Sequence, residues 1–384
     1  MADSYTETTH QGWFSRIGDS IKGILFGIIA IPVCVILLWW NESRAVTTAN
    51  SLKEGAAAVV SVPSDKVDPA NDKKLVHVTG DARAPAEIVD PEFGISAPAL
   101  KLSREVEIYQ WVEDKKTEKK EKVGGGEETK TTYTYSKKWV DEPVNSSEFK
   151  QPSDHVNTGS LVAESRSIAA EGVTLGAFDV PQSFVNRMGG DAPFPVGEAQ
   201  LSDAMKGKAK VHNSGLYFGQ NPSTPQIGDQ RVTFEIVKPG TFSIMAAQIG
   251  KTFEPYQTKA GDALSMIEPG TVSAEAMFKS AAAANAMLTW ILRFVGFLFM
   301  AFGFMAIMRP LSVLGSVIPF IGNIIGMGTG LISFVLAGTI SLLVIAIAWI
   351  AVRPVLGITL LVLVIGGFIM MRKMAASSKA AAAA

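Results

Sequence analysis

Carboxylates are missing from the last quarter of this chain. The 98 residues from Met287 to Ala384 contain no aspartate or glutamate, which is unlike the surface of a soluble domain. The chain has a single cysteine, Cys34, which excludes an internal disulfide and a C-x-x-C metal or thiol site. The net charge of −1 and the charged fraction of 18% exclude a basic nucleic-acid binder and a disordered chain.

The charges that are present are unevenly distributed. Residues 41–286 hold 27 basic and 33 acidic residues, and the rest of the chain holds only 8 and 3. Before this polar region, Gly23–Trp40 is an uncharged run of 18 residues, long enough as a helix of about 27 Å to cross the hydrocarbon core. Bulky residues, WWNESR, end the run, and they favour a signal anchor over a cleavable signal peptide. The pattern predicts a membrane protein with one large polar domain.

We predict four membrane spans with both termini in the cytoplasm, because an even count places the basic residues that flank the spans on one side. The expected fold class is an integral membrane α-helical protein with a large β-rich α+β extramembrane domain between spans 1 and 2. The predicted segments are a cytoplasmic N-terminus (1–22), span 1 (23–40), a luminal or periplasmic domain (41–286), span 2 (287–308), a glycine-rich re-entrant or interfacial segment (309–330), span 3 (331–352), span 4 (354–371) and a cytoplasmic basic tail (372–384).

The glycine-rich segment could instead be a fifth span, but Pro319 and its glycines suit a lipid-facing helix poorly. Gly322, Gly326 and Gly330 form a small-xxx-small ridge. Such a ridge serves either self-association or packing within one chain, and both interpretations stay open.

Three polar residues are candidate lipid contacts: Arg293, Arg309 and Asn323. Arg293 lies near the start of span 2, so we favour snorkelling to the interface over a buried, partnered charge.

The polar domain shows mainly strand patterns. Apolar residues alternate along Leu100–Val112, and a second strand is predicted at Thr131–Val140, with Gly124–Gly126 as the turn between them. The mixed-charge run Asp114–Lys122 is interpreted as a solvated hairpin tip, with a headgroup or partner contact as the alternative. Further predictions are strands at Leu75–Thr79, Arg231–Val237, Thr241–Ala247 and Ala263–Ile267, and a helix at Thr271–Ala284 that runs into span 2.

No catalytic or cofactor-binding motif stands out. There is no Walker A sequence, G-x-S-x-G, H-E-x-x-H or dinucleotide fingerprint, and the four histidines are too scattered to suggest a metal site. We therefore expect no enzyme, with no catalytic, cofactor-binding or metal-binding residue and no cofactor.

Several segments, in order, resemble the transmembrane-protein-43 family, also called LUMA. They are NESRAVTTANSLKEG, VEIYQWVED, TYTYSKKWV, PQIGDQRVTFEIV, FEPYQTKAGDAL, GTVSAEAMF and WIAVRPVLG, and the resemblance covers about residues 12–373. It implies four spans and a large luminal domain, and it carries over no catalytic residue. For a eukaryotic member it implies the endoplasmic reticulum and inner nuclear membrane, self-association and partners of the emerin and lamin type. The short N-terminus and single cysteine favour a bacterial member, with the domain in the periplasm.

These observations lead to a primary hypothesis and three alternatives. The primary hypothesis is a non-enzymatic, self-associating membrane scaffold whose partners are lipids, further copies of itself and other membrane-associated proteins. A lipid- or stress-responsive sensor is the first alternative, with Arg293, Arg309 and Asn323 forming a polar pocket. An oligomeric channel and, more remotely, a hydrolase are the others. No nucleic-acid partner is expected.

Overall fold

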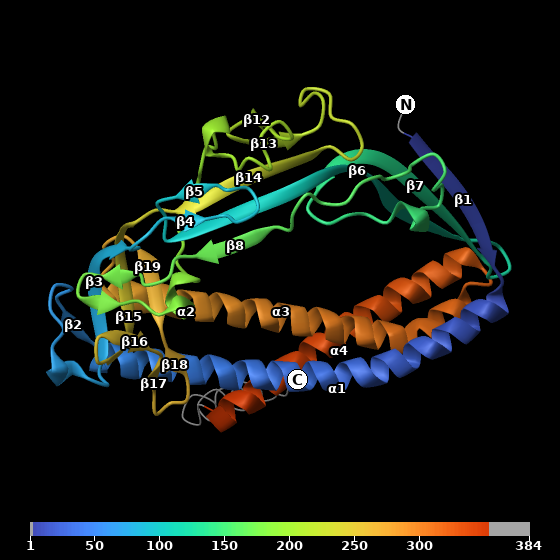
Figure 1. Cartoon of the computed structure of the whole chain (residues 1–384). Helices are drawn as coiled ribbons and strands as arrows, with labels where there is room; N and C mark the ends of the chain where they lie inside the picture. Colours follow the sequence, from blue (N-terminus) through green and yellow to red (C-terminus); the bar gives the residue numbers. More distant parts are fainter. Residues whose placement is uncertain (1–2, 353–384) are drawn as a thin grey trace, which may run out of the picture. The chain divides into compact units, whose positions relative to one another are not determined.

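The computed structural model describes residues 3–352, and the chain divides into two compact units (Figure 1). The β-rich unit comprises Met1–Thr8, Ser51–Glu118 and Lys130–Ser280, and the helical unit comprises Thr9–Asn50, Lys119–Thr129 and Ala281–Ala384. Within residues 3–352, three helices are long and apolar enough to cross a membrane. The prediction of four spans is therefore not supported, since the fourth (354–371) lies, with the basic tail, outside the described residues.

Two mainly antiparallel sheets build most of the β-rich unit. The first has the order β1-β7-β6-β14-β13-β12, with β11 beside β14 and β8 beside β6. Its strands are β1 (Asp3–Gln11), β6 (Lys101–Glu121), β7 (Glu127–Val140), β8 (Arg166–Ala169), β11 (Asp191–Pro193), β12 (Lys210–His212), β13 (Gly215–Phe218) and β14 (Gln230–Val237).

The second sheet has the order β10-β9-β3-β15-β16, with β19 beside β15 and β2 parallel to β3. Its strands are β2 (Val60–Val62), β3 (Leu75–Arg83), β9 (Thr174–Leu175), β10 (Phe178–Asp179), β15 (Gly240–Ile249), β16 (Thr252–Glu254) and β19 (Met266–Pro269). Smaller elements are the pairs β4 (Ile88–Val89) with β5 (Ser96–Ala97) and β17 (Tyr256–Gln257) with β18 (Ala263–Leu264), and the one-turn helix α2 (Gln182–Val185).

The core of this unit follows from the alternation along β6. Val106 pairs with Val232 of β14, and Leu102 pairs with Ile236. All four side chains are buried, in one cluster with apolar residues from both sheets. The alternation predicted for Leu100–Val112 is therefore confirmed, because one face of a strand packs inward while the other meets solvent.

The β6–β7 hairpin is confirmed but is longer than predicted. The charged run Asp114–Lys122 is solvated as predicted, because residues 114–120 are exposed, but it lies mostly within β6 and not in the turn itself. Charges on the two strands pair across the hairpin, with Lys138 2.8 Å from Asp114 and Lys119 2.8 Å from Glu127. The other predicted strands are also present, although the one at Ala263–Ile267 is divided between β18 and β19.

The N-terminal segment is a strand and not a free tail. Strand β1 forms one edge of the first sheet, next to β7. Within the β-rich unit, Asp3 accepts a hydrogen bond from the fully buried His155 at 2.8 Å, and Glu7 pairs with Lys150 at 2.7 Å. Residues 3–8 thus belong to one unit with residues 51–118 and 130–280, whereas the sequence prediction placed them on opposite sides of the membrane.

The long helices are α1 (Trp13–Ala58), α3 (Ala274–Gly315) and α4 (Pro319–Val352). Helix α3 runs from the predicted stalk through span 2 without a break, as expected, and Ser273 caps its start by accepting from the Ala276 N–H. It continues to Gly315, and α4 begins at Pro319. Residues 309–330 are therefore two helix ends and a short turn, continuous with the flanking helices, and their re-entrant or interfacial position in the membrane stays a prediction.

The backbones of helices α1 and α3 approach closely where Gly27 of α1 faces Gly303 of α3. A Cβ atom added to Gly27 would lie 2.4 Å from the Gly303 carbonyl oxygen and 2.5 Å from a side-chain carbon of Ile307. Gly23 and Gly27 form a G-x-x-x-G pair that the sequence analysis did not single out, and close approach of helix backbones is its known use. Cys34, Leu38 and Met300 continue the apolar contact between these helices.

We predict that Gly27→Ala destabilises the helical unit, by about 1–3 kcal/mol for overpacking. The matched control is Gly18→Ala, because an added Cβ there meets nothing within 4 Å. Alanine favours helix over glycine, so the control is expected to leave the thermal midpoint in detergent unchanged or raise it. Equal midpoints for the two variants would contradict this account of the contact.

Candidate functional site: two polar networks in the helical unit

The first polar network joins all three helices through Glu42. The Glu42 carboxylate on α1 accepts from Arg293 Nε at 2.6 Å and Nη2 at 2.7 Å, both on α3. It also accepts from the Trp349 indole Nε1–H on α4 at 2.7 Å. Glu42 is 1% exposed. We call these contacts, with the neighbouring residues described next, the Glu42 network.

Aromatic rings and amides surround this ion pair. The Arg293 guanidinium lies 4.8 Å from the Trp290 ring centroid and 5.6 Å from that of Trp349, at cation–π distance. One helical turn before Arg293 on α3, Thr289 Oγ1 accepts a hydrogen bond from Arg44 of α1 at 3.0 Å. Arg44 also donates to Asn285 Oδ1 at 2.9 Å. The network therefore fixes α1 against α3 by charge-assisted, two-pronged hydrogen bonds, which are the most geometrically specific kind.

Arg293 is thus partnered, and the expectation that it snorkels is corrected. Pairing is favoured over snorkelling because a carboxylate and a guanidinium neutralise each other and satisfy each other's hydrogen bonds away from water. The sequence carried a signal for this, since NESR follows the first apolar run and a lone arginine interrupts the second. Charges of opposite sign beside two apolar helices are expected to pair.

We predict that Arg293→Met destabilises the protein by about 3–5 kcal/mol, because it leaves the Glu42 carboxylate buried and unpaired. The double variant Glu42→Gln/Arg293→Met is expected to be closer to the parent in stability than the single variant. A double-mutant cycle of thermal midpoints in nanodiscs measures the coupling. Strictly additive effects would show that the ion pair does not hold the helices together.

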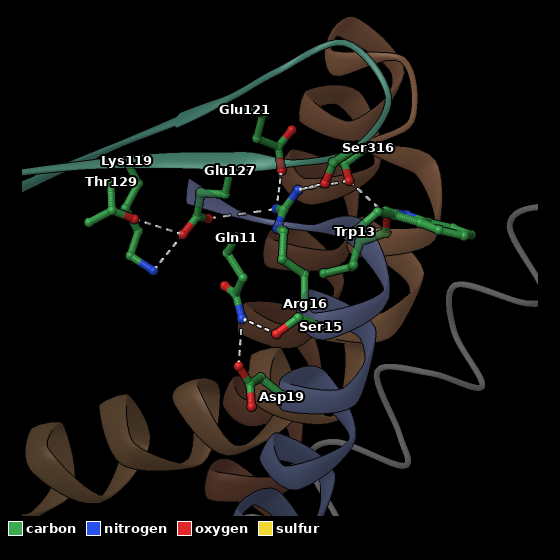
Figure 2. A network of polar contacts seen from close by, with 12 residues as sticks. Gln11, Trp13, Ser15, Arg16, Asp19, Lys119, Glu121, Glu127, Thr129 and Ser316 are labelled. Atoms are coloured by element: carbon green, nitrogen blue, oxygen red, sulfur yellow. Dashed lines mark hydrogen bonds and ion pairs between the residues drawn. The ribbon is translucent and has the colours of Figure 1, made fainter. Parts of the chain in front are cut away.

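The second polar network surrounds Arg16 near the start of α1 (Figure 2). Arg16 Nη2 lies 2.6 Å from Glu121 Oε1 and 3.7 Å from Glu127 Oε2 of the hairpin. Its Nη1 donates to the Gly125 carbonyl at 2.6 Å and to Ser316 Oγ at 3.0 Å. Arg16 is 5% exposed. We call these contacts the Arg16 network.

Backbone contacts hold the hairpin turn in place around Arg16. The Gly124 N–H donates to the Val317 carbonyl in the α3–α4 turn at 2.9 Å, and the Trp13 indole donates to the Val313 carbonyl at 2.9 Å. Gly125 has a φ of 79°, and a Cβ atom there would lie 2.3 Å from the Trp13 ring. Glycine is therefore required at this turn by both backbone conformation and space.

One acidic partner of Arg16, Glu127, has a lowered pKa. Burial by itself raises the pKa of Glu127, but its hydrogen bond from Lys119 and the charges of Lys119 and Arg16 outweigh burial, and the pKa lies below the ordinary value of 4.5. A lowered pKa means that the contact stabilises the fold above pH 4.5 and loses this contribution as the pH falls through the lowered pKa.

We predict that the hairpin turn loosens only below about pH 4.5. Hydrogen–deuterium exchange of residues 119–129, corrected for intrinsic rates, is expected to be constant from pH 7 to 5 and to rise towards pH 3. Glu127→Gln is expected to raise exchange already at pH 7. Residues 131–138 of the same hairpin are the internal reference. Loosening of both segments together at low pH would contradict a role for the Arg16 network.

The structure does not bring the predicted lipid-contact residues together. Arg293 and Arg309 are both on α3, and 16 residues of helix place them about 24 Å apart. Arg309 and Asn323 are exposed, whereas Arg293 is committed to Glu42. The single polar pocket proposed for a lipid sensor is therefore not formed by these three residues.

The three ridge glycines have different surroundings on α4. A Cβ atom at Gly322 would lie 2.7 Å from Ser316 Cα, so Gly322 packs within its own chain. One at Gly326 would meet only Ser312 Oγ, at 3.2 Å, and one at Gly330 would meet nothing within 4 Å. Packing within one chain therefore applies to Gly322, and self-association stays a prediction for Gly326 and Gly330.

The β-rich unit contains a cavity of about 350 Å³, bordered by β6, β13 and β14. The charged and aromatic side chains that line this cavity bind each other. Arg231 makes a two-pronged contact with Glu107 and lies 4.7 Å from the Trp139 ring centroid. The Tyr217 hydroxyl donates to Asp229 at 2.5 Å, and burial together with that bond raises the pKa of Tyr217. Within residues 3–352, no group of three or more His, Cys, Asp or Glu side chains is placed to hold a metal ion.

The three long apolar helices of the described part of the chain, together with a large β-rich unit, define an integral membrane protein. The family model for transmembrane protein 43 matches residues 108–354. The rat protein named transmembrane protein 43 is 32% identical over 91% of this chain and 89% of its own length. The human protein is 31% identical over 90% and 88%, and the Drosophila melanogaster homolog is 29% identical over 88% and 90%. The chain belongs to the transmembrane protein 43 family. No solved structure matches it.

Proposed function

We propose that this protein is a non-enzymatic, self-associating membrane scaffold. Its apolar helices hold it in the membrane, and its β-rich unit presents a folded surface to other proteins. The observation that carries self-association is the open space at Gly330. This glycine lies in an exposed apolar stretch of α4, between Met327 and Phe334, and nothing in its own chain occupies the space above it.

Small residues on a membrane helix allow a second helix to approach its backbone, and the resulting van der Waals contacts and Cα–H···O bonds replace lipid contacts. Gly326 is one helical turn from Gly330 and shares this face, with only the Ser312 hydroxyl nearby. The proposed surface is therefore Gly326 with Gly330, and Gly322 is excluded from it by its contact with Ser316.

The two polar networks support a scaffold because they hold the helices in a defined arrangement. In the helical unit Glu42, Arg293 and Trp349 connect three helices, and Arg16 connects the hairpin turn to the α3–α4 turn. A surface used for assembly gains affinity when its parts are fixed before binding. Emerin- and lamin-type partners, the inner nuclear membrane and the bacterial inner membrane stay predictions from the family resemblance.

We predict that Gly330→Leu reduces the oligomer size measured by mass photometry in native nanodiscs. The matched control is Gly328→Leu, since Gly328 is on the same helix, also has nothing within 4 Å, and points to a different face. The control is expected to keep the parent distribution. Parent-like oligomers for Gly330→Leu, or a monomeric parent protein, would remove self-association through this surface.

A further inference from the structure

The cavity bordered by β6, β13 and β14 is built on one face of the first sheet. Tyr217 of β13 lies opposite Arg231 of β14, and Arg231 lies opposite Glu107 of β6. In the neighbouring row, Thr233 of β14 lies opposite Glu105 of β6. Residues directly opposite on paired strands, or two positions apart on one strand, share a face of the sheet. These five side chains therefore lie on one face, where they line the cavity.

Two aromatic rings form a wall of this cavity. The Trp139 ring of β7 and the Tyr217 ring have centroids 6.2 Å apart, in an edge-to-face arrangement. Tyr217 is 2% exposed, and its hydroxyl group is bound to Asp229, which fixes the ring. Such a wall attracts a cation, because the face of an aromatic ring carries partial negative charge.

Arg231 shows which chemical group these walls accommodate. Its guanidinium lies 4.7 Å from the Trp139 ring centroid and donates to both carboxylate oxygens of Glu107. A planar guanidinium combines stacking on a ring with two-pronged binding of a carboxylate, which an ammonium group does not. The cavity therefore already holds one guanidinium by the two kinds of contact that a second one would use.

Glu105 is the exception to the pairing of charges in this cavity. Its side chain is exposed at the rim, and within residues 3–352 its carboxylate makes no ion pair or hydrogen bond. Because Glu107 neutralises Arg231, Glu105 gives the lining its net negative charge. An anionic ligand would be repelled by this carboxylate, whereas a cationic ligand would neutralise it.

The cavity has room for one side chain and is open to solvent. Its volume of about 350 Å³ is near the lower end of the range of about 300–1,000 Å³ for ligand pockets. It therefore suits a single side chain better than a nucleotide-sized cofactor. The rim residues Glu105, His212 and Thr233 are exposed, so a ligand can enter without rearrangement of the sheet. Gly215 also lines the cavity and has no side chain to fill it.

We propose that this cavity binds the guanidinium group of an arginine side chain from a partner protein. Glu105 neutralises this group and accepts its hydrogen bonds, and Trp139 and Tyr217 supply the aromatic wall. Arginine is enriched among the few residues that dominate the energies of protein interfaces, so one such side chain suits an anchor. The inference rests on the proposed scaffold function only in assigning the arginine to another protein, and it does not depend on self-association.

Saturation-transfer-difference NMR of the full-length protein in nanodiscs tests the site with a small probe. The probe is N-acetyl-arginine methylamide, and its citrulline analogue has nearly the same shape without the charge. The arginine probe is expected to receive saturation from the protein, and the citrulline probe is expected to receive little. Equal signals from the two probes would overturn the proposal.

A charge-neutral variant locates the binding of the probe. Glu105→Gln is expected to weaken it about tenfold, because a hydrogen bond to a charged group is lost. The matched control is Glu235→Gln, which makes the same change of charge at an exposed residue of β14 outside the cavity. Both positions are exposed, so both variants are expected to keep the parent thermal midpoint. Parent-like binding by Glu105→Gln, or an equal loss in both variants, would contradict the assignment.

A second probe separates a partner protein from a free small molecule. n-Butylguanidinium carries the same charged group without the peptide groups, so it is expected to bind no more tightly than N-acetyl-arginine methylamide. Tighter binding of n-butylguanidinium would overturn the assignment to a partner protein. The oligomer size is measured in the same nanodiscs. Intact oligomers that do not bind the arginine probe would refute this inference and leave self-association standing.

Discussion

The pairing of strand β1 with β7 is the constraint on which the rest of the structure depends. It makes the residues before the first apolar run part of the same sheet as the residues after it. Because α1 is one unbroken helix, it is both preceded and followed in the chain by strands of the same β-rich unit. The contacts of Arg16 with the hairpin turn and of Trp13 with α3 apply the same constraint inside the helical unit.

The helical unit is polar in two places and apolar between them. Arg16 and Glu42 are 26 residues apart on α1, about 39 Å along the helix, and each carries a network of charge-assisted hydrogen bonds. Between them, Gly27 allows close backbone approach, and Cys34 and Leu38 pack against α3. Apolar packing alone specifies helix register weakly when lipid competes for the same surfaces. The ion pairs supply the register that packing leaves open.

Sequence patterns predicted the β-rich unit well where burial is one-sided. The alternation at Leu102 and Val106 fixed the strand and its core face, because a shift by one residue would expose both. The lengths of the uncharged apolar runs predicted the three described helices, because about 20 apolar residues are needed to cross a membrane. Strand β1 was missed because its threonines, glutamate and histidine have no apolar alternation, and it is held by polar contacts to residues more than 120 positions away.

The candidate sites show the same limit of sequence reasoning. A lone arginine in an apolar run can be recognised, but whether Arg293 snorkels or pairs depends on which helix lies beside it, and that helix supplies Glu42 from 251 residues away. The ridge glycines could be listed from spacing alone, yet only the position of Ser316 distinguishes the packed Gly322 from the open Gly330. The positive-inside argument placed residues 1–22 and 41–286 on opposite sides of the membrane, and no sequence pattern indicated that β1 joins residues 3–8 to the β-rich unit.

A disulfide between β1 and β7 is the most direct test of the pairing on which the structure depends. The hydroxyls of Thr6 and Thr132 lie 3.3 Å apart, so the variant Thr6→Cys/Thr132→Cys, made in a Cys34→Ala background of the full-length protein, is expected to form a disulfide under mild oxidation in membranes. A folded protein in which these two thiols stay reduced would contradict the pairing.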